Sequence, residues 1–537
     1  MSEQSAATAP PKQRPGMSPR ARWVSASALA TLLLASLDQN VVGSAAWPIA
    51  QDLDPQRGLQ LLPWLFTVYI LASTATQPLY GKLSDIYGPK AVFVFSTSLF
   101  VAGSALCGLS QNMIELIVFR AVQGIGAGGL VGVTLVIIAV ISPPRTRAKR
   151  SGLGGAVIGG GTIAGPLLGG FIADHATWRW LFYINLPLGI AALIIMLIAF
   201  QMPKQQRREP VDIGGAVLIA LATSVILLIT DWGGNRYSWS SPTIIGLAVV
   251  GVVTFAVFVW QERRTPAPIL PFSLFRNPVY RIVSPLQFLT GLSIMSAPVY
   301  LGTYLQIGRS QTPSHSALFT VPLAAGLIVM STFGGIWISR FGRYRMILLV
   351  GNVLCTVALF MLGVLNSSTP VWYIALDLLL LGAGLGSLIQ VTTLAVQNAM
   401  PPSQLGVATI SVRFSNRIGQ AFGTAILGAL LNTLFLAQLP AQYTNTVAHG
   451  AVDIGQIHEL SAQAQHVVRE AFVTASNQLY LIAAALSLVT VVLSIFVRET
   501  IQDAEAAGVG EPDPVLAPAA AADSPADDTG PGLSARS

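Results

Sequence analysis

The chain carries very little charge for its length. Only 10% of its 537 residues are Asp, Glu, Lys or Arg, whereas 53% are hydrophobic. A soluble protein carries about 25% charged residues, so this composition cannot coat several soluble domains. The scarcity of charge excludes a soluble chain and favours a polytopic membrane protein.

Cysteine is also scarce. The two cysteines, Cys107 and Cys355, each lie in the middle of an apolar run. We expect both to be small buried hydrophobic side chains, which excludes a disulfide framework and a cysteine metal site.

The sequence offers no nucleotide-binding loop. Gly81-Lys82 is followed by Leu83, so no phosphate-binding lysine motif is present, and the spaced glycines Gly124 and Gly126 lie inside an apolar run with no strand before them. No nucleophile or metal-ligand cluster stands out either. The sequence therefore predicts no enzyme and no cofactor, and the energy for any transport would come from an ion gradient.

Long apolar runs are abundant. Fourteen of them are long enough to span a membrane as helices, near residues 24–46, 61–80, 90–109, 114–140, 151–173, 180–201, 213–230, 242–260, 282–306, 316–337, 346–366, 371–395, 408–433 and 473–497. The first run is longer than a signal core and contains an acid, so we expect it to be retained. An even number of spans places both termini on one side.

The basic residues orient these spans. Segments on the side of the termini hold 22 of the 30 Lys and Arg residues, the loops on the other side hold five, and three lie within spans. Cytoplasmic loops are enriched in Lys and Arg, so both termini are predicted to be cytoplasmic. Basic loops facing anionic lipid account for the net charge of +7 without any nucleic-acid partner.

A repeat divides the chain. The segment from Gly81 to Gly88 returns 254 residues later as Gly335 to Gly342, with Ser339 in place of Asp85. Both copies have the same predicted topology, so the repeat is parallel. The spans near 213–230 and 242–260 have no counterpart, which gives a plan of six spans, two inserted spans and six spans.

Three ionisable residues lie inside predicted spans at similar depth. Asp38 is roughly 21 Å from the cytoplasmic end of an outward-running helix, and Arg120 and Asp377 are each roughly 9 Å below the outer end of an inward-running helix. In a hydrocarbon core about 30 Å thick these depths coincide. A charge there costs about 3 kcal/mol or more and is usually functional, although separate structural pairs remain the alternative.

The chain resembles the major facilitator superfamily, in particular its fourteen-span drug:proton antiporter branch. The resemblance covers about residues 24–498. It rests on five ordered signatures, which are Leu37-Asp38, Gly81 to Lys90, Arg120 to Gly126, Gly161 to Gly170 and Trp178 to Gly189. It implies an all-α membrane protein of the major facilitator fold, with two parallel-repeat six-helix bundles plus two inserted helices, 14 transmembrane helices in all.

The resemblance assigns roles to the signature residues. It implies that Asp38 carries the coupling proton and that Arg120 tunes its site, and Asp377 is either a second proton site, a substrate contact or a structural pair. A conformational latch is expected from Gly81, Asp85, Gly88 and Lys90, although Pro89 stands where the family often has a basic residue. Helix packing typical of antiporters is expected from Gly161, Gly165, Pro166, Gly169 and Gly170.

The substrate cavity has its own candidates. They are the polar and aromatic side chains Gln39, Asn40, Gln123, Tyr300, Tyr304, Gln390 and Arg417. For the two tyrosines, a place in the aromatic belt at the membrane surface is the competing interpretation.

The sequence thus predicts a proton-coupled antiporter in the cytoplasmic membrane of a bacterium. It would export amphipathic drugs, dyes or antibiotics by alternating access, as a monomer, and an acidic cavity would favour cations among them. An exporter of one metabolite or lipid, a nutrient symporter and a non-transporting receptor are the alternatives. The expected domains are the disordered tails 1–23 and 498–537, the bundles 24–201 and 282–497, the inserted helices 202–281, and an outer loop 434–472 holding a short surface helix.

Overall fold

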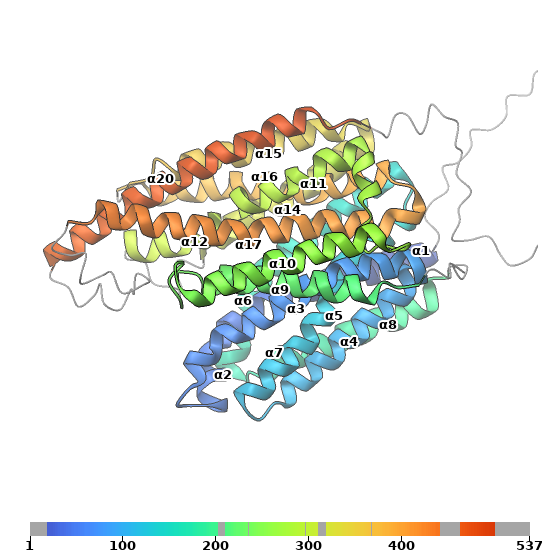
Figure 1. Cartoon of the computed structure of the whole chain (residues 1–537), viewed down its shortest axis with the longest axis horizontal. Coiled ribbons are helices and arrows are strands. Elements are labelled where there is room, and N and C mark those ends of the chain that lie inside the picture. The colour runs from blue at the N-terminus through green and yellow to red at the C-terminus, as the bar shows by residue number, and fades with distance from the viewer. Residues whose placement is uncertain are drawn as a thin grey trace, which may run out of the picture.

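The computed structural model of the chain describes residues 19–201, 210–234, 236–295, 297–309, 318–366, 368–440 and 462–499. This part of the chain is built of long helices that run roughly along one direction, joined by short connections (Figure 1). The prediction of an all-helical membrane protein is confirmed for these residues.

The first group of helices forms one bundle. It contains α1 (Pro19–Val41), α3 (Gly58–Tyr87), α4 (Pro89–Leu109), α5 (Met113–Val140), α6 (Pro144–His175) and the consecutive pair α7 (Trp180–Tyr183) and α8 (Asn185–Ala199). Between α1 and α3 lie the short turn η1 (Val42–Ala45) and helix α2 (Ala46–Leu53). Residues 19–23 belong to α1 rather than to the predicted disordered tail, because the helix continues towards the N-terminus beyond its apolar stretch.

The last group forms a second bundle. It contains a broken span made of α11 (Pro278–Thr290), η3 (Gly291–Met295), α12 (Ala297–Thr303) and η4 (Tyr304–Gly308), then α14 (Thr320–Phe341), α15 (Tyr344–Leu362), α16 (Val371–Ala399), α17 (Leu405–Gln438) and α20 (Ala462–Ile495). The segments η3 and η4 are π-helical turns, which are frequent at functional sites.

Two inserted helices, α9 (Ile213–Trp232) and α10 (Pro242–Arg264), complete the described segments. With α7–α8 and α11–η4 counted as one span each, these residues hold fourteen long helical segments, as predicted. Twelve are long and apolar enough to cross a membrane. Helices α1 and α3 are not among these twelve.

Some predicted features lie outside the described residues. They are the tails at 1–18 and 500–537 and the part of the outer loop at 441–461, including the surface helix expected there. On either side of that gap, α17 and α20 extend well into the predicted loop. The domain limits themselves stay a prediction.

The two bundles lie beside one another, and the inserted pair fills part of the space between them. In Figure 1 the first bundle (blue to cyan) is below, the second (yellow-green to red) is above, and α9 and α10 (green) lie between. Helix α3 packs on α17 and α6 packs on α14, while α9 contacts both α3 and α17. The inserted pair therefore covers one of the two seams between the bundles.

Repeated glycines bring the bundles close together. A Cβ atom at Gly81 of α3 would lie 3.1 Å from the Cα of Val407, and one at its repeat partner Gly335 of α14 would lie 2.7 Å from the carbonyl oxygen of Ala148. In lipid, the burial of apolar surface does not drive helices together. Association depends on close packing instead, and small residues permit it. The repeat predicted from the sequence therefore occupies matching places at both seams.

The bundles meet at the end of the molecule where α1 begins and α20 ends, which we call the terminal face. Near it, Arg147 of α6 donates to the side-chain oxygen of Asn398 at 2.9 Å, and Asp85 of α3 accepts from the start of α17. At the opposite face the bundles leave a cavity, described below. The structure is thus closed at the terminal face.

Candidate functional site

A buried ion pair lies inside the first bundle. The Nη1 atom of Arg120 on α5 donates to Oδ2 of Asp38 on α1 at 3.0 Å, and the two side chains are 2% and 0% exposed. The depths estimated from the sequence predicted that these residues could meet, and the structure brings them together. Removing one partner of such a pair costs about 3–5 kcal/mol, because it leaves an uncompensated buried charge.

Amide side chains complete the bonding of Asp38. Its Oδ1 atom accepts hydrogen bonds from Gln123 at 2.8 Å and from Asn185 at 3.0 Å. Both amides also donate to the hydroxyl of Ser104, at 3.1 and 3.0 Å. Arg120, Gln123 and Asn185 all donate to this carboxylate, an arrangement that suits the ionised form.

The guanidinium of Arg120 is equally enclosed. It lies 4.0 Å from the centre of the Tyr69 ring and 5.9 Å from that of Phe182. Its Nη1 atom also donates to Oε1 of Gln123 at 2.8 Å, and its Nε atom to the carbonyl of Leu65 at 3.4 Å. Aromatic faces and carbonyl oxygens replace water around the cation, so the pair is held in one geometry.

Sequence reasoning found only part of this network. Asn185 lies within the Trp178 to Gly189 signature, which implied no role for that residue, and Ser104 belongs to no predicted site. Gln123 was expected in the substrate cavity, whereas the structure places it against Asp38 and Arg120. Because Gln123 follows Arg120 by three residues, the two share a helix face, and that spacing was the available clue.

Asp377 occupies a separate place in the second bundle. It is fully buried on α16, and neither carboxylate oxygen has a hydrogen-bond partner among the described residues. The hydroxyl of Tyr480, also buried, likewise lacks one among them. Asp377 therefore does not share in the hydrogen bonds of Asp38 and Arg120. An unpaired carboxylate in an apolar interior is strongly disfavoured in its charged form, which points to a neutral acid.

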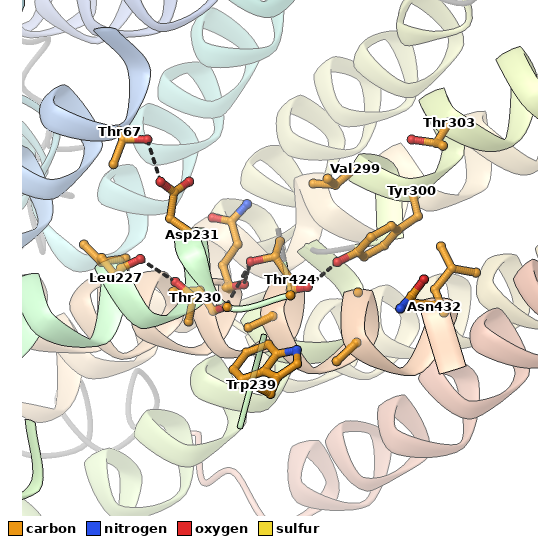
Figure 2. A pocket seen from close by; sticks show the side chains of 18 of the residues that line it. Thr67, Leu227, Thr230, Asp231, Trp239, Val299, Tyr300, Thr303, Thr424 and Asn432 are labelled. Atoms are coloured by element: carbon orange, nitrogen blue, oxygen red, sulfur yellow. Dashed lines mark hydrogen bonds between the residues drawn. The ribbon is translucent and has the colours of Figure 1, made fainter. Parts of the chain in front are cut away.

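A cavity of about 710 Å³ lies between the bundles. Its walls come from α3, α9, α12, α17 and α20 and from the loop after α9 (Figure 2). Two of the predicted cavity residues, Tyr300 and Arg417, line it. The Tyr300 hydroxyl donates to the carbonyl of Thr424, and Arg417 donates to Gln420 at 3.4 Å.

The other predicted cavity residues lie elsewhere, which corrects the prediction for this conformation. Gln39 and Asn40 do not line the cavity, and Asn40 donates to the carbonyl of Ser36 within α1. Tyr304 is fully buried in the core of the second bundle. Gln390 donates at 3.4 Å to the carbonyl of Gly152, at the contact between α16 and α6. Helical depth did not reveal which way each side chain points.

The predicted latch residues divide into two groups. Asp85 accepts hydrogen bonds from the backbone N–H groups of Gly406 at 2.7 Å and Val407 at 2.9 Å, so it caps the first turn of α17 across the bundle interface. Gly81 permits the close approach of α3 to α17. Gly88 has φ of 83°, which suits glycine at the turn into α4. Lys90 instead donates to the carbonyls of Leu197 and Phe200. It therefore stays within the first bundle and is not part of the latch.

Glycines on one face of α6 form the contact with α1. Cβ atoms at Gly161 and Gly165 would each lie 2.6 Å from the Cβ atoms of Ser36 and Asn40 respectively, and one at Gly169 would lie 2.0 Å from the hydroxyl of Ser44. These glycines are four residues apart, so they share one helix face.

Gly170 does not belong to this contact, because no heavy atom lies within 4 Å of its Cβ position. Pro166 lies inside α6 without ending the helix, which runs on to His175.

A second ion pair lies at the opposite face. Oδ2 of Asp52 accepts from Arg179 at 2.8 Å and from the indole of Trp178 at 2.9 Å. The Trp178 hydrogen bond, together with the Arg179 interaction, lowers the pKa of Asp52 below its usual value. Because Asp52 is half exposed, the pair contributes little to stability, and it ties α2 to the start of α7.

Comparison with known proteins agrees with this architecture. A sequence model described as Major Facilitator Superfamily matches residues 28–424. An uncharacterized MFS-type transporter of Mycobacterium tuberculosis (strain ATCC 25618 / H37Rv) is 35% identical over 502 residues, covering 92% of this chain and 72% of that protein. Multidrug resistance protein 3 of Bacillus subtilis (strain 168) is 31% identical over 418 residues, covering 78% of this chain and 81% of that protein.

Solved structures show the same fold. The human organic anion transporter MFSD10 superposes with a TM-score of 0.61 at 14% identity, covering 88% of this chain and all of that one. The proton:xylose symporter XylE gives a TM-score of 0.60 at 14% identity, covering 90% of this chain and 97% of that one. With fourteen long helical segments among its described residues, arranged as two bundles and an inserted pair, this chain is a multi-pass membrane protein and belongs to the major facilitator superfamily.

Proposed function

We propose that the protein is a proton-coupled efflux transporter for amphipathic drugs, dyes or antibiotics. The observation that carries the proposal is the Asp38–Arg120 pair, which is buried at 0% and 2% exposure and bonded to two amides. Ionisable residues inside a membrane protein mark ion pathways by default. Relatives named multidrug resistance protein and multidrug transporter protein support the substrate class.

The orientation follows from the basic residues. The segments predicted to lie on the side of the termini hold 22 of the 30 Lys and Arg residues, which favours the cytoplasm for that side. The protein would then lie in the cytoplasmic membrane of a bacterium as a monomer with both termini inside. The described conformation, closed at the terminal face with a cavity towards the opposite face, corresponds to an outward-facing state.

The transport cycle uses one site alternately open to each side. When the site is accessible from outside, a proton neutralises Asp38 and weakens its ion pair with Arg120. When the bundles rock inward, Asp38 returns the proton to the cytoplasm and pairs with Arg120 again, as substrate binds. The differing charge of Asp38 in the two states would couple proton entry to substrate exit.

Asp377 is the second proton carrier in this proposal. Its burial without a hydrogen-bond donor fits a protonated acid in the described state. One charge crossing 100 mV gains about 2.3 kcal/mol, and one pH unit gains about 1.36 kcal/mol per proton. Two protons entering for one monocation leaving would support more than about a thousandfold accumulation at those gradients.

The test uses inverted membrane vesicles with an imposed proton gradient and a fluorescent cationic dye. We expect gradient-driven dye uptake by the wild type and its loss in Asp38→Asn, which keeps the shape but cannot carry the proton. Asp174→Asn removes an exposed carboxylate at the end of α6 and serves as the matched control. Equal gradient-driven uptake by wild type and Asp38→Asn would remove Asp38 from the coupling mechanism.

A further inference from the structure

The cavity is bounded in part by the inserted helix pair. The residues Leu227, Thr230 and Asp231 of α9 and Trp239 of the following loop form one part of its wall. Figure 2 shows Asp231 on α9 with its carboxylate towards Thr67, and Val299 and Tyr300 of α12 on the other side of the cavity. A volume of about 710 Å³ lies in the range that holds drug-sized ligands.

Two charged side chains are among the residues that line this cavity, and they belong to different elements. Asp231 lies on the inserted helix α9, and Arg417 lies on α17 of the second bundle. A cation in the cavity is therefore attracted towards α9 and repelled from the wall at Arg417. This polarity gives the cavity a preferred position for a positive group.

The rest of the lining suits an amphipathic body. Aromatic rings come from Trp239, Tyr300, Phe435 and Phe472. Their faces attract organic cations and pack against apolar groups. Threonine hydroxyls at Thr67 on α3 and Thr303 on α12 add polar atoms to the lining. The lining thus combines one carboxylate with a largely apolar, aromatic surface.

The carboxylate is held in place by the first bundle. Thr67 of α3 donates to Oδ2 of Asp231 at 3.2 Å, and the rings of Trp64 and Trp232 pack edge to face with their centres 5.9 Å apart. These contacts tie the end of α9 to α3, and the opposite wall belongs to α12 and α17.

We propose that this cavity is a binding site for amphipathic organic cations, with Asp231 as the counter-charge. The inference rests on the proposed efflux function and gives the inserted helices a part in substrate selection. The positive group of the ligand lies at Asp231, and its apolar body lies on the aromatic wall. Because the site faces the outer side, it receives the cation before release.

The test measures binding and transport of two probes in the full-length protein. Tetraphenylphosphonium serves as the amphipathic cation and chloramphenicol as the uncharged probe. We expect Asp231→Asn to bind tetraphenylphosphonium at least about tenfold more weakly, because it loses a charge-assisted contact. Thr230→Lys places a positive charge beside the same site and should give a similar loss. Chloramphenicol carries no charge to pair with Asp231, so its transport should fall less than tetraphenylphosphonium binding in both variants.

Asp174→Asn is the matched control, since it removes an exposed carboxylate that does not line the cavity. If neither probe moves in the wild type, the proposed function and this inference fall together. If the wild type moves chloramphenicol but does not bind tetraphenylphosphonium, this inference alone is overturned. Unchanged tetraphenylphosphonium binding in a folded Asp231→Asn or Thr230→Lys protein overturns it as well.

Discussion

The hydrogen bonds between Asp85 and α17 allow a quantitative prediction. The carboxylate accepts from Gly406 at 2.7 Å and from Val407 at 2.9 Å, across the interface between the bundles. These contacts exist only while the terminal face is closed, because the two partners lie on different bundles. Asp85→Ala should therefore destabilise the closed arrangement relative to the open one, with little effect on either bundle alone.

The size of the effect follows from the geometry. Loss of a helix-capping side chain costs about 0.5–2 kcal/mol, and a negative charge at a helix N-terminus contributes up to about 2 kcal/mol when partly buried. These two figures describe overlapping effects, so we take about 2 kcal/mol for the whole contact. That corresponds to a roughly 30-fold shift in the ratio of closed to open molecules. Asp85→Asn keeps one acceptor and should shift it less.

Distances between spin labels can measure this ratio. Tyr87→Cys and Phe341→Cys place labels at exposed positions that match in the repeat, at the ends of α3 and α14, and the native cysteines are buried. Asp85→Ala should move population from the short to the long distance. Ser339→Ala, at the repeat position of Asp85, is the control. An unchanged distribution in Asp85→Ala, or an equal shift in the control, would refute the reasoning.

Three further predictions follow from individual contacts. Gly165→Ala should lower the free energy of unfolding by about 1–3 kcal/mol, because its Cβ would lie 2.6 Å from the Cβ of Asn40. Gly170→Ala should be tolerated, and equal melting temperatures of the two variants would contradict this. Asp377→Asn should leave stability at pH 7 nearly unchanged if the acid is neutral, and a large stabilisation would indicate a buried charge. The ion pair that lowers the pKa of Asp52 stabilises the fold while the carboxylate is ionised, which is above about pH 4. The small difference in stability between wild type and Asp52→Asn should therefore vanish as the pH falls below that value and the carboxylate is protonated.

The sequence predicted the architecture well because its signals are local or periodic. Long apolar runs must become helices in lipid, since every backbone polar group needs an internal partner. The glycine segments at Gly81 and Gly335 revealed the repeat, and depth along two helices predicted that Asp38 and Arg120 could meet. The structure confirms that contact at 3.0 Å, although their role in proton coupling stays a proposal.

The side-chain surroundings were less predictable. Depth along a helix does not say which face of it turns to the cavity, so Gln123 and Tyr304 were placed there although both are buried inside a bundle. Lys90 was grouped with the latch because it is near Asp85 in sequence, yet it bonds within the first bundle. The inserted helices had no repeat counterpart and therefore no predicted part in a site.

The sequence by itself determined that this protein spans a membrane, that it has two repeated halves, and that its first half buries an acid and an arginine. These properties depend on composition, on the repeated glycine segments and on the number of residues along each helix, all of which a single sequence contains. Only the tertiary structure decided that Asn185 and Ser104 complete the acid's surroundings and that Asp231 lines a cavity shared with Arg417. Those contacts join residues far apart in the chain, and their geometry is set by how helices rotate and pack against one another.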